Sequence, residues 1–377
     1  MFKGKRLWLL FTVVIMSVIL IACGGNNNGG DSNSSGDSNA ADNNANDNNN
    51  NDGNASADSG DPVEIRFAHE EGSGDVQDLY VNKFKEILEE ETDGRISVDV
   101  YTAGTLGGND DLFTQLQTGA IEFAISSPGF TGTVIPETQI MAVPFLFSDN
   151  MEVNKEVLDS SEALYGPLAD KYEEKGLTPF KFWLEGFMYW TANKPIETPD
   201  DMKGLKMRGM PTDLIMESYR QMGADPQGTD SGEIYTMLQT GGIDGQENPL
   251  FYVYSSKFYE VQDYLINSKH HIYTTVTVAN SDWFSSLSDD DQQLIRDTIQ
   301  EVNDWSFDMQ QEEHDKAMAE IEKSDIEIIE LTSEQREQFK EATMGVRDAY
   351  KEKGGEAAAE IIDTIAQEIE EAEAAAN

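Results

Sequence analysis

The stretch Leu238-Gln-Thr-Gly-Gly-Ile-Asp-Gly-Gln-Glu-Asn-Pro249 gives the strongest indication of how this chain folds. Its first half has a counterpart upstream, because Leu116-Gln-Thr-Gly-Ala-Ile-Glu122 lines up with Leu238-Gln-Thr-Gly-Gly-Ile-Asp244. In both copies an amphipathic helix ends at a glycine, Gly119 or Gly241, where a left-handed C-cap is wanted, and a short apolar strand follows. This repeated helix–strand unit predicts two lobes of one topology. Only the second copy continues into Gln-Glu-Asn-Pro, so we expect the lobes to differ in what they bind.

Strands and helices alternate around this unit. In the first half we expect strands at 63–68, 95–101 and 121–125, and helices at 76–92, up to 119, and about 150–175. In the second half we expect a strand at 205–210, a helix at 213–222, a β-rich segment at 264–279, and mostly helix from 288 onward. Such alternation predicts an α/β fold with a mostly parallel sheet, arranged as a two-lobed clamshell with a helix-rich C-terminal part.

The N-terminus reads as a targeting segment. Residues 1–22 combine a basic start (Lys3, Lys5, Arg6) with an uncharged, mostly apolar run that is short for a membrane span. The run ends in Leu20-Ile-Ala-Cys23, which resembles the lipobox of a bacterial lipoprotein signal. This resemblance implies that Cys23 is lipidated and holds the folded part outside the cell membrane; the alternative is an uncleaved anchor.

Residues 23–61 are expected to form a disordered tether. From residue 24 onward they are almost entirely Asn, Asp, Gly, Ser and Ala, and they cannot bury enough apolar surface to offset the entropy of ordering. Because Cys23 is the only cysteine, a disulfide or a cysteine-based metal site within one chain is excluded.

The net charge is −45, and removal of the three basic residues of the signal makes it −48. Phosphate repels such a surface, so nucleic acid is not expected as a partner. The acids are spread along the whole chain, which favours a solvated, salt-adapted surface over a dedicated attractor for a cationic substrate.

Two residues of the second lobe have the chemistry of a carboxylate site. Arg208 ends a short strand, and a guanidinium can hold a carboxylate through two parallel hydrogen bonds. Asn248 precedes Pro249, and its amide both donates and accepts. The alternatives are a surface ion pair for Arg208 and a plain turn for Asn248. Open α/β sheets bind ligands beyond the carboxyl ends of their strands, so two facing lobes predict a cleft between them.

Further candidates lie on the loops and strand ends around this cleft. Phe130 and Phe251 are either ligand walls or packing residues, and most aromatics of this kind belong to the core. Glu71 follows the first strand at its carboxyl edge, where a carboxylate can pair with a cationic group; the alternative is a solvated acid.

Catalytic readings find little support. The chain has four histidines, and the neighbours His270 and His271 are expected to point to opposite faces of a strand. No metal-binding His pair, nucleophile elbow or phosphate loop with its lysine occurs. We therefore expect no catalytic residue, no metal and no cofactor.

With these residues in place, the chain resembles the substrate-binding proteins of tripartite ATP-independent periplasmic (TRAP) transporters, of the DctP type. The likeness runs from about Val63 to Lys353 and is most specific at 204–208, 233–235 and 238–249. It implies a periplasmic-binding-protein-like clamshell that closes on a small carboxylated solute, which Arg208 clamps and Asn248 supports. It also implies delivery to an ion-gradient-driven permease and no enzymatic activity.

Within the family, Phe67–Glu71, Gly74–Gln77 and Ser127–Gly132 look like the ectoine-binding branch. This resemblance implies that Glu71 meets a cationic ring and that Phe130 and Phe251 enclose it. Two positions depart from the pattern. Met188 stands where many members have an arginine, which argues against a dicarboxylate, and Ser231 stands at the position of the branch's cage tryptophan.

Together these inferences predict a monomeric, lipid-anchored, extracytoplasmic receptor for a carboxylated or zwitterionic solute, with ectoine and hydroxyectoine as the leading specific ligands. The alternatives are a receptor for another organic acid, such as a hydroxy or keto acid, and a surface enzyme or adhesive lipoprotein. Lobe I is expected at 62–185 with about 274–313, and lobe II at 186–273 with about 314–375.

Overall fold

A computed structural model describes residues 60–376. The predicted signal peptide, Cys23 and the tether as far as residue 59 lie outside the described residues. In the described part, no helix combines the length and the apolar character that crossing a membrane requires.

The helix–strand unit predicted from the repeat is present in both places. Helix α2 (Asn109–Gln117) leads into strand β3 (Phe123–Ser126), and α8 (Ile234–Thr240) leads into β7 (Gly245–Pro249). After the two helices, Gly119 has φ +70° and Gly241 has φ +71°. Both glycines adopt the left-handed conformation that a side chain would strain. The prediction of one unit used twice is confirmed.

The strands form one mixed sheet whose two ends carry equivalent parallel units. Its order is β2-β1-β3-β9-β4-β7-β5-β6, with β8 attached to β4 and β10 attached to β8. Strand β1 pairs in parallel with β2 and β3, and β5 pairs in parallel with β6 and β7. The bounds of the remaining strands are β1 (Val63–Ala68), β2 (Ile96–Tyr101), β4 (Leu177–Ala192), β5 (Lys206–Gly209), β6 (Asp225–Gly228), β8 (Tyr264–Asn267), β9 (Ile272–Asn280) and β10 (Glu327–Glu330).

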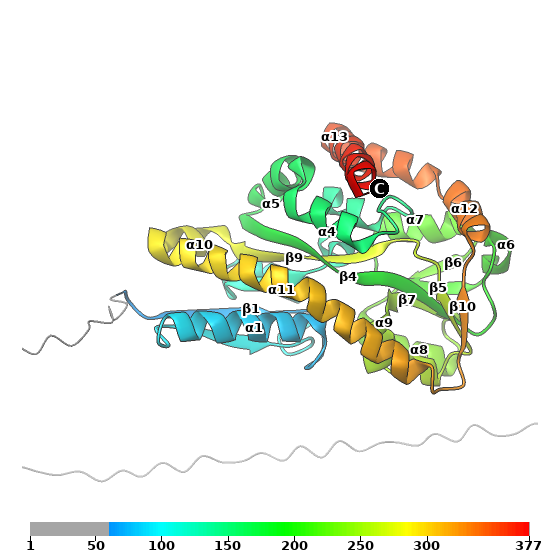
Figure 1. Cartoon of the computed structure of the whole chain (residues 1–377), viewed down its shortest axis with the longest axis horizontal. Coiled ribbons are helices and arrows are strands. Elements are labelled where there is room, and N and C mark those ends of the chain that lie inside the picture. The colour runs from blue at the N-terminus through cyan, green and yellow to red at the C-terminus, as the bar shows by residue number, and fades with distance from the viewer. Residues whose placement is uncertain (1–59, 377) are drawn as a thin grey trace, which may run out of the picture. The chain divides into compact units, whose positions relative to one another are not determined.

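One long central strand, β4, joins the two halves. The first part of β4, as far as Phe187, pairs antiparallel with β9, and its last five residues, from Met188, pair with β7. The register shifts between Leu184 and Gly186, and Gly186 has φ +123°, so the strand bends there. The chain thus passes from one half to the other within a continuous strand, β4, which crosses the middle of the molecule in Figure 1. This arrangement is the α/β clamshell expected from the sequence.

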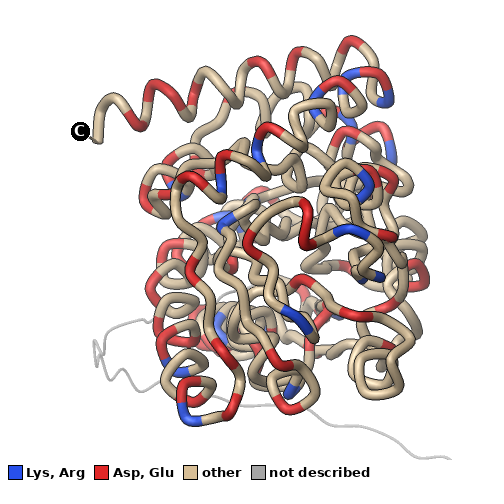
Figure 2. Tube along the Cα trace, turned by 90° about the vertical axis from the view of Figure 1, so that its right-hand side faces the viewer, with Lys and Arg blue, Asp and Glu red and all other residues tan. Residues whose placement is uncertain are grey.

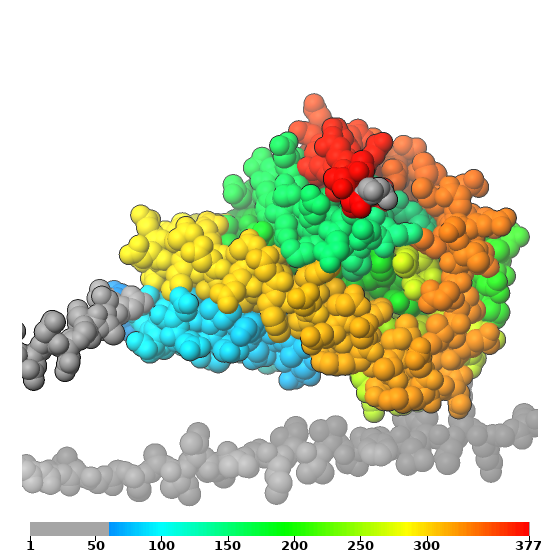
Figure 3. All heavy atoms as spheres, viewed as in Figure 1, coloured from blue at the N-terminus to red at the C-terminus, as the bar shows by residue number. Residues whose placement is uncertain are grey.

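Helices cover both halves. Helix α11 (Asp289–Ile321) packs on α1 (Val76–Glu91), β4 and α9 (Leu250–Ser255), and in Figure 3 it runs across the front of the molecule between the segments coloured cyan and green. Helix α13 (Gly345–Ala376) packs on α4 (Met151–Ser160) and on α7 (Asp213–Met222).

The lobe boundaries expected from the sequence stay a prediction. The short helices are α3 (Pro128–Thr131), η1 (Pro136–Ala142), η2 (Leu164–Leu168), α5 (Ala169–Glu173), α6 (Pro199–Met202), η3 (Ser231–Glu233), η4 (Phe258–Glu260), α10 (Ser281–Ser286) and α12 (Ser333–Ala342).

The expected helix at 150–175 is interrupted. Helix α4 ends at Ser160, and a π-helical turn, η2, precedes α5. Pro167 lies inside that turn, and it cannot donate the backbone hydrogen bond that a regular helix needs.

The acidic residues are distributed over the whole trace in Figure 2, as expected from their spread in the sequence.

Candidate functional site

A small cavity lies where the parallel strands of both halves end. Its volume is about 20 Å³, which is enough for roughly one water molecule. In this arrangement, with the two halves in contact, the cavity has no room for an organic solute. Most lining residues come from the carboxyl ends of strands and from the segments that follow them, whereas Tyr273 lies at the start of β9. The lining comprises Glu70, Glu71, Asn109, Phe130, Arg208, Met210, Ser231, Asn248, Pro249, Tyr252 and Tyr273.

Arg208, in β5, is the cation of this cavity. It is 1 % exposed, and its Nε and Nη2 donate hydrogen bonds to the carbonyl oxygen of Thr229 at 3.1 and 2.7 Å. Within the described part of the chain, Arg208 forms no ion pair. Burial lowers the pKa of the guanidinium, and the negative charge of Glu247 opposes this change. A buried guanidinium without an anion in contact is costly, because its desolvation is not offset.

Asn248 lies beside Arg208 on the same surface of the sheet. Arg208 is in register with Gln246 in the neighbouring strand β7, and side chains two residues apart in a strand share a face. The Asn248 amide donates to the Gln246 side-chain oxygen, and Gln246 donates to Thr191 Oγ1 at 3.1 Å. This chain of hydrogen bonds fixes the Asn248 side chain, so that its oxygen and its second N–H remain for a ligand.

The opposite wall of the cavity is acidic. Glu70 and Glu71 follow β1, and both are almost fully buried. Burial raises the pKa of Glu70 to about 7, although hydrogen bonds from Ser126 and Ser127 oppose it. Burial and the neighbouring Glu185 raise the pKa of Glu71. The cavity therefore has a cationic end at Arg208 and an end lined by carboxyl groups at Glu71.

The cavity brings together five of the seven residues predicted for ligand binding: Arg208, Asn248, Glu71, Phe130 and Ser231. Two lie elsewhere. Met188 is buried in β4, opposite Pro249 of β7. Phe251 packs into the core and borders another surface hollow with Gly74 and Tyr254. In the closed arrangement, the aromatic walls are therefore Phe130, Tyr252 and Tyr273.

Some lining residues were not identified from the sequence. Tyr273 lies in β9, whose run of β-branched residues reads as core. Asn109 reads as a helix start, and Met210 as the end of a strand. Glu185 does not line the cavity but lies directly behind Glu71 in β4. The only feature of the sequence that could have indicated Glu185 is its charge inside an aromatic-rich strand, because a buried acid needs hydrogen-bond or ionic partners.

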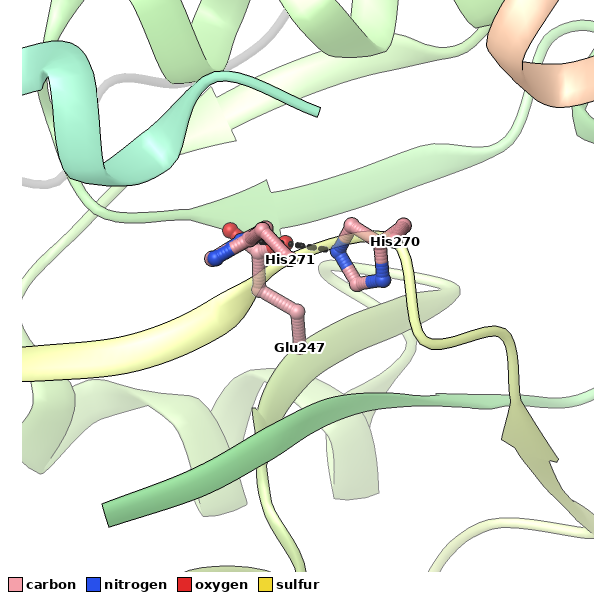
Figure 4. A group of neighbouring side chains, drawn as sticks. All are labelled: Glu247, His270 and His271. Atoms are coloured by element: carbon pink, nitrogen blue, oxygen red, sulfur yellow. Dashed lines mark hydrogen bonds and ion pairs between the residues drawn. The ribbon is translucent and has the colours of Figure 1, made fainter. Parts of the chain in front are cut away.

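A second buried cluster lies on the other face of β7. Glu247, His270 and His271 bring one donor atom each within 4.8 Å of one another (Figure 4), a donor set of the kind that binds zinc. Here the contacts are hydrogen bonds: Glu247 Oε2 lies 2.6 Å from the Tyr219 hydroxyl and 2.9 Å from His270 Nε2. The two histidines converge on this oxygen, so the prediction that they point to opposite faces was wrong. Both precede β9, and Lys269 before them has φ +47°, which turns the chain.

The pKa values of this cluster follow from its burial and its contacts. Burial opposes ionisation of Glu247, but hydrogen bonds from His270 and His271 outweigh it, so the pKa of Glu247 lies well below its usual range. Burial, together with the neighbouring His271, lowers the pKa of His270 to about 4. The cluster is thus the ionised carboxylate of Glu247, held by the Tyr219 hydroxyl and the two imidazoles on the face of β7 opposite to Asn248.

A larger hollow of about 610 Å³ lies on the surface between α12, α13 and the segment 145–149. Cations and anions line it together, including Arg336, Lys340, Arg347, Asp149 and Glu370. Arg336 already pairs with Asp149. None of the residues predicted for ligand binding lies there.

The chain is similar to known proteins of one family. Residues 67–353 match the family described as "Bacterial extracellular solute-binding protein, family 7", DctP. The ectoine-binding periplasmic protein TeaA of Halomonas elongata is 38 % identical over 311 residues, which cover 81 % of this chain and 89 % of that protein. The ectoine/5-hydroxyectoine-binding periplasmic protein UehA of Ruegeria pomeroyi is 37 % identical over 306 residues, or 81 % of this chain and 90 % of that protein.

Among solved structures, the periplasmic ectoine-binding protein of the TeaABC TRAP transporter of Halomonas elongata superposes with a TM-score of 0.79. It is 36 % identical in sequence, and the match covers 81 % of this chain and 99 % of that one. The predicted resemblance is confirmed.

Proposed function

Because the chain belongs to the DctP family of TRAP transporter solute-binding proteins, we propose that it captures a small carboxylated zwitterion in the cavity between its two halves. Ectoine and hydroxyectoine are the leading ligands. Members of this family bind solutes and work with permease subunits in the membrane, and they are transport proteins rather than enzymes.

The observation that carries this proposal is the buried, unpaired guanidinium of Arg208. Its Nη1 has no hydrogen-bond partner within residues 60–376, and the group faces the cavity. A ligand carboxylate would supply the missing anion through charge-assisted hydrogen bonds. Asn248 offers an amide next to it.

The carboxyl groups at the other end favour a zwitterion over a dicarboxylate. A second ligand carboxylate would lie against Glu70 and Glu71, where like charges repel. A cationic nitrogen would be attracted there, and Phe130 and Tyr252 would cover the apolar part of the ligand. Ser231, which stands at the position of the ectoine branch's cage tryptophan, also lines the cavity. At this position the present chain therefore has a small side chain instead of an aromatic ring.

Calorimetric titration tests this function. We expect ectoine or hydroxyectoine to bind at a single site, and succinate and galactonate to bind more weakly. Arg208→Ala should lower the affinity by at least about 100-fold, because two charge-assisted hydrogen bonds are lost. Arg347→Ala is the matched control, since it removes a half-buried arginine of the larger surface hollow. Undiminished affinity of the Arg208 variant would refute the clamp.

We further propose that the protein is a monomer anchored to the outer surface of the cell membrane through lipidated Cys23. The support is the signal-like segment 1–22 and its Leu-Ile-Ala-Cys ending. Replacement of Cys23 by Ser should abolish acyl labelling in cells and shift the protein out of the membrane fraction. Equal labelling of both forms would contradict the anchor, and light scattering of the purified protein tests the monomer.

A further inference from the structure

Behind the acidic wall of the cavity, Glu71 and Glu185 lie next to each other, because Gln77 donates one hydrogen bond to each of them, from its backbone N–H and from its side-chain amide. Both are nearly inaccessible, at 3 % and 1 % exposure. A carboxylate has only acceptor atoms, so two carboxyl groups can bond to each other only when one of them carries a proton. In the described part of the chain, neither forms an ion pair.

The remaining contacts restrict where this proton lies. Glu71 Oε2 accepts a hydrogen bond from the backbone N–H of Gln77 at 2.9 Å. Glu185 Oε1 accepts from Gln77 Nε2 at 3.1 Å and from Thr275 Oγ1 at 2.9 Å. Glu185 Oε2 is buried and receives no hydrogen bond from any other residue that the structure describes. The second oxygen of Glu71 and Oε2 of Glu185 are therefore the carboxyl oxygens that no other described residue occupies with a hydrogen bond, so they are free to share a proton.

Within residues 60–376, the nearest cation that lines the same cavity is Arg208, at its opposite end, and it forms no ion pair with Glu71 or Glu185. The other titratable groups near the pair are Glu70, Asp75, Tyr252 and Tyr273, which are acids or phenols, and His69, whose pKa is lowered by burial and whose Nδ1 accepts a hydrogen bond from the Glu71 backbone N–H at 3.4 Å. Two adjacent, desolvated carboxylates would repel each other strongly at this position. Gln77 holds both carboxyl groups in place from the first turn of α1.

We propose that Glu71 and Glu185 share one proton in the ligand-free site, and that the cationic nitrogen of a bound zwitterion takes the place of that proton. The O–H bond of Glu71 breaks, the proton goes to the buffer, and the ligand cation compensates the charge that is left. The total charge of the pair and its occupant is then −1 before and after binding.

This inference rests on the proposed function and adds a criterion for the ligand. A ligand end with a fixed positive charge can replace the proton. A neutral hydroxyl group or a carboxylate cannot, so sugar acids and dicarboxylates leave the proton in place. Glu185, which does not line the cavity, is a positioning residue that determines whether Glu71 is charged.

Calorimetry in buffers of different ionisation enthalpy measures the proton directly. With ectoine at about pH 8, where Glu70 is mostly ionised, the observed enthalpy should depend on the buffer with a slope of about one proton released. In Glu185→Gln the amide can donate to an ionised Glu71, so binding should persist with a slope of about zero. A wild-type slope of zero, or an unchanged slope in Glu185→Gln, would overturn the proposal.

Infrared spectroscopy provides a readout that needs no ligand. At about pH 8, where Glu70 is mostly ionised, the ligand-free protein should show the C=O band of a protonated buried carboxyl group. The band should disappear in Glu185→Gln and in Glu71→Gln, whose amide retains a donor toward Glu185. Its absence from the wild-type protein would refute the shared proton even if no tested solute binds. Binding without proton release would refute the shared proton alone and leave the proposed function standing.

Discussion

A Cβ atom on Gly129 would lie 2.1 Å from Met210 Sδ and 2.9 Å from Met210 Cβ. Gly129 is in α3, which follows β3 in the first half of the sheet, and Met210 directly follows β5 in the second half. The two halves therefore meet at this point without room for a methyl group. Phe130 and Met210 both line the cavity, so this contact forms part of its closure.

Gly129→Ala should weaken solute binding without unfolding the protein. The added methyl group collides with Met210 only when the halves are closed, and overpacking of this kind costs about 1–3 kcal/mol, or roughly 5- to 150-fold in affinity. Calorimetry and thermal unfolding of the ligand-free protein measure the two effects. Gly232→Ala is the control, because a Cβ there has no atom within 4 Å. Wild-type affinity in Gly129→Ala would mean that this contact is not part of the bound state.

Arg208→Met should abolish binding while the ligand-free protein keeps its stability or gains about 1 kcal/mol. A buried charge without an anion is destabilising, and an apolar side chain of similar length removes that cost. Urea unfolding of the ligand-free proteins measures the change in the free energy of unfolding, with Arg347→Met as the comparison. A loss of several kcal/mol would indicate that Arg208 serves mainly to hold the fold together.

His270 should make the protein less stable in acid. Its pKa is lowered to about 4, so between pH 6.5 and 4 the unfolded chain binds a proton that the folded protein does not. Stability therefore falls as the pH drops through this window, by up to about 3 kcal/mol.

The effect of His270 is measured as a difference between two proteins. Glu70 and Glu185, whose pKa values are both raised to about 7, act in the opposite direction, because their contribution to stability is lost as the pH rises from 4.5 to 7. Chemical denaturation of the wild-type protein and of His270→Gln across this range isolates the histidine. Curves that differ by a constant amount at all pH values would contradict the assignment.

The repeated Leu-Gln-Thr-Gly unit was sufficient to predict the two related halves, because helix periodicity, a glycine cap and an apolar strand are all local signals. The clamshell followed from their alternation. The break within 150–175 was missed, since Pro167 stands in a run with apolar residues at helical spacing. The positive φ of Lys269 could not be predicted from the sequence either. It turns the chain so that His270 and His271 both point toward the carboxylate of Glu247.

The site was predictable where a residue both ends a strand and carries a distinctive group, as Arg208, Asn248 and Glu71 do. Glu185 and Tyr273 could not be found in this way, because they lie inside strands whose other residues read as core. Their position next to the cavity depends on the pairing of β4 with β9, which brings residues about 90 positions apart into register. Long-range pairing of this kind is not encoded in any local pattern.

A crystal structure of the protein with ectoine tests the central claim most directly. We predict that the ligand carboxylate lies in the cavity within hydrogen-bond distance of the Arg208 guanidinium and the Asn248 amide, and that its ring nitrogens face Glu71. The two halves should enclose it, with Gly129 against Met210. A carboxylate bound away from Arg208, for example at Arg347 in the larger hollow, would contradict the account.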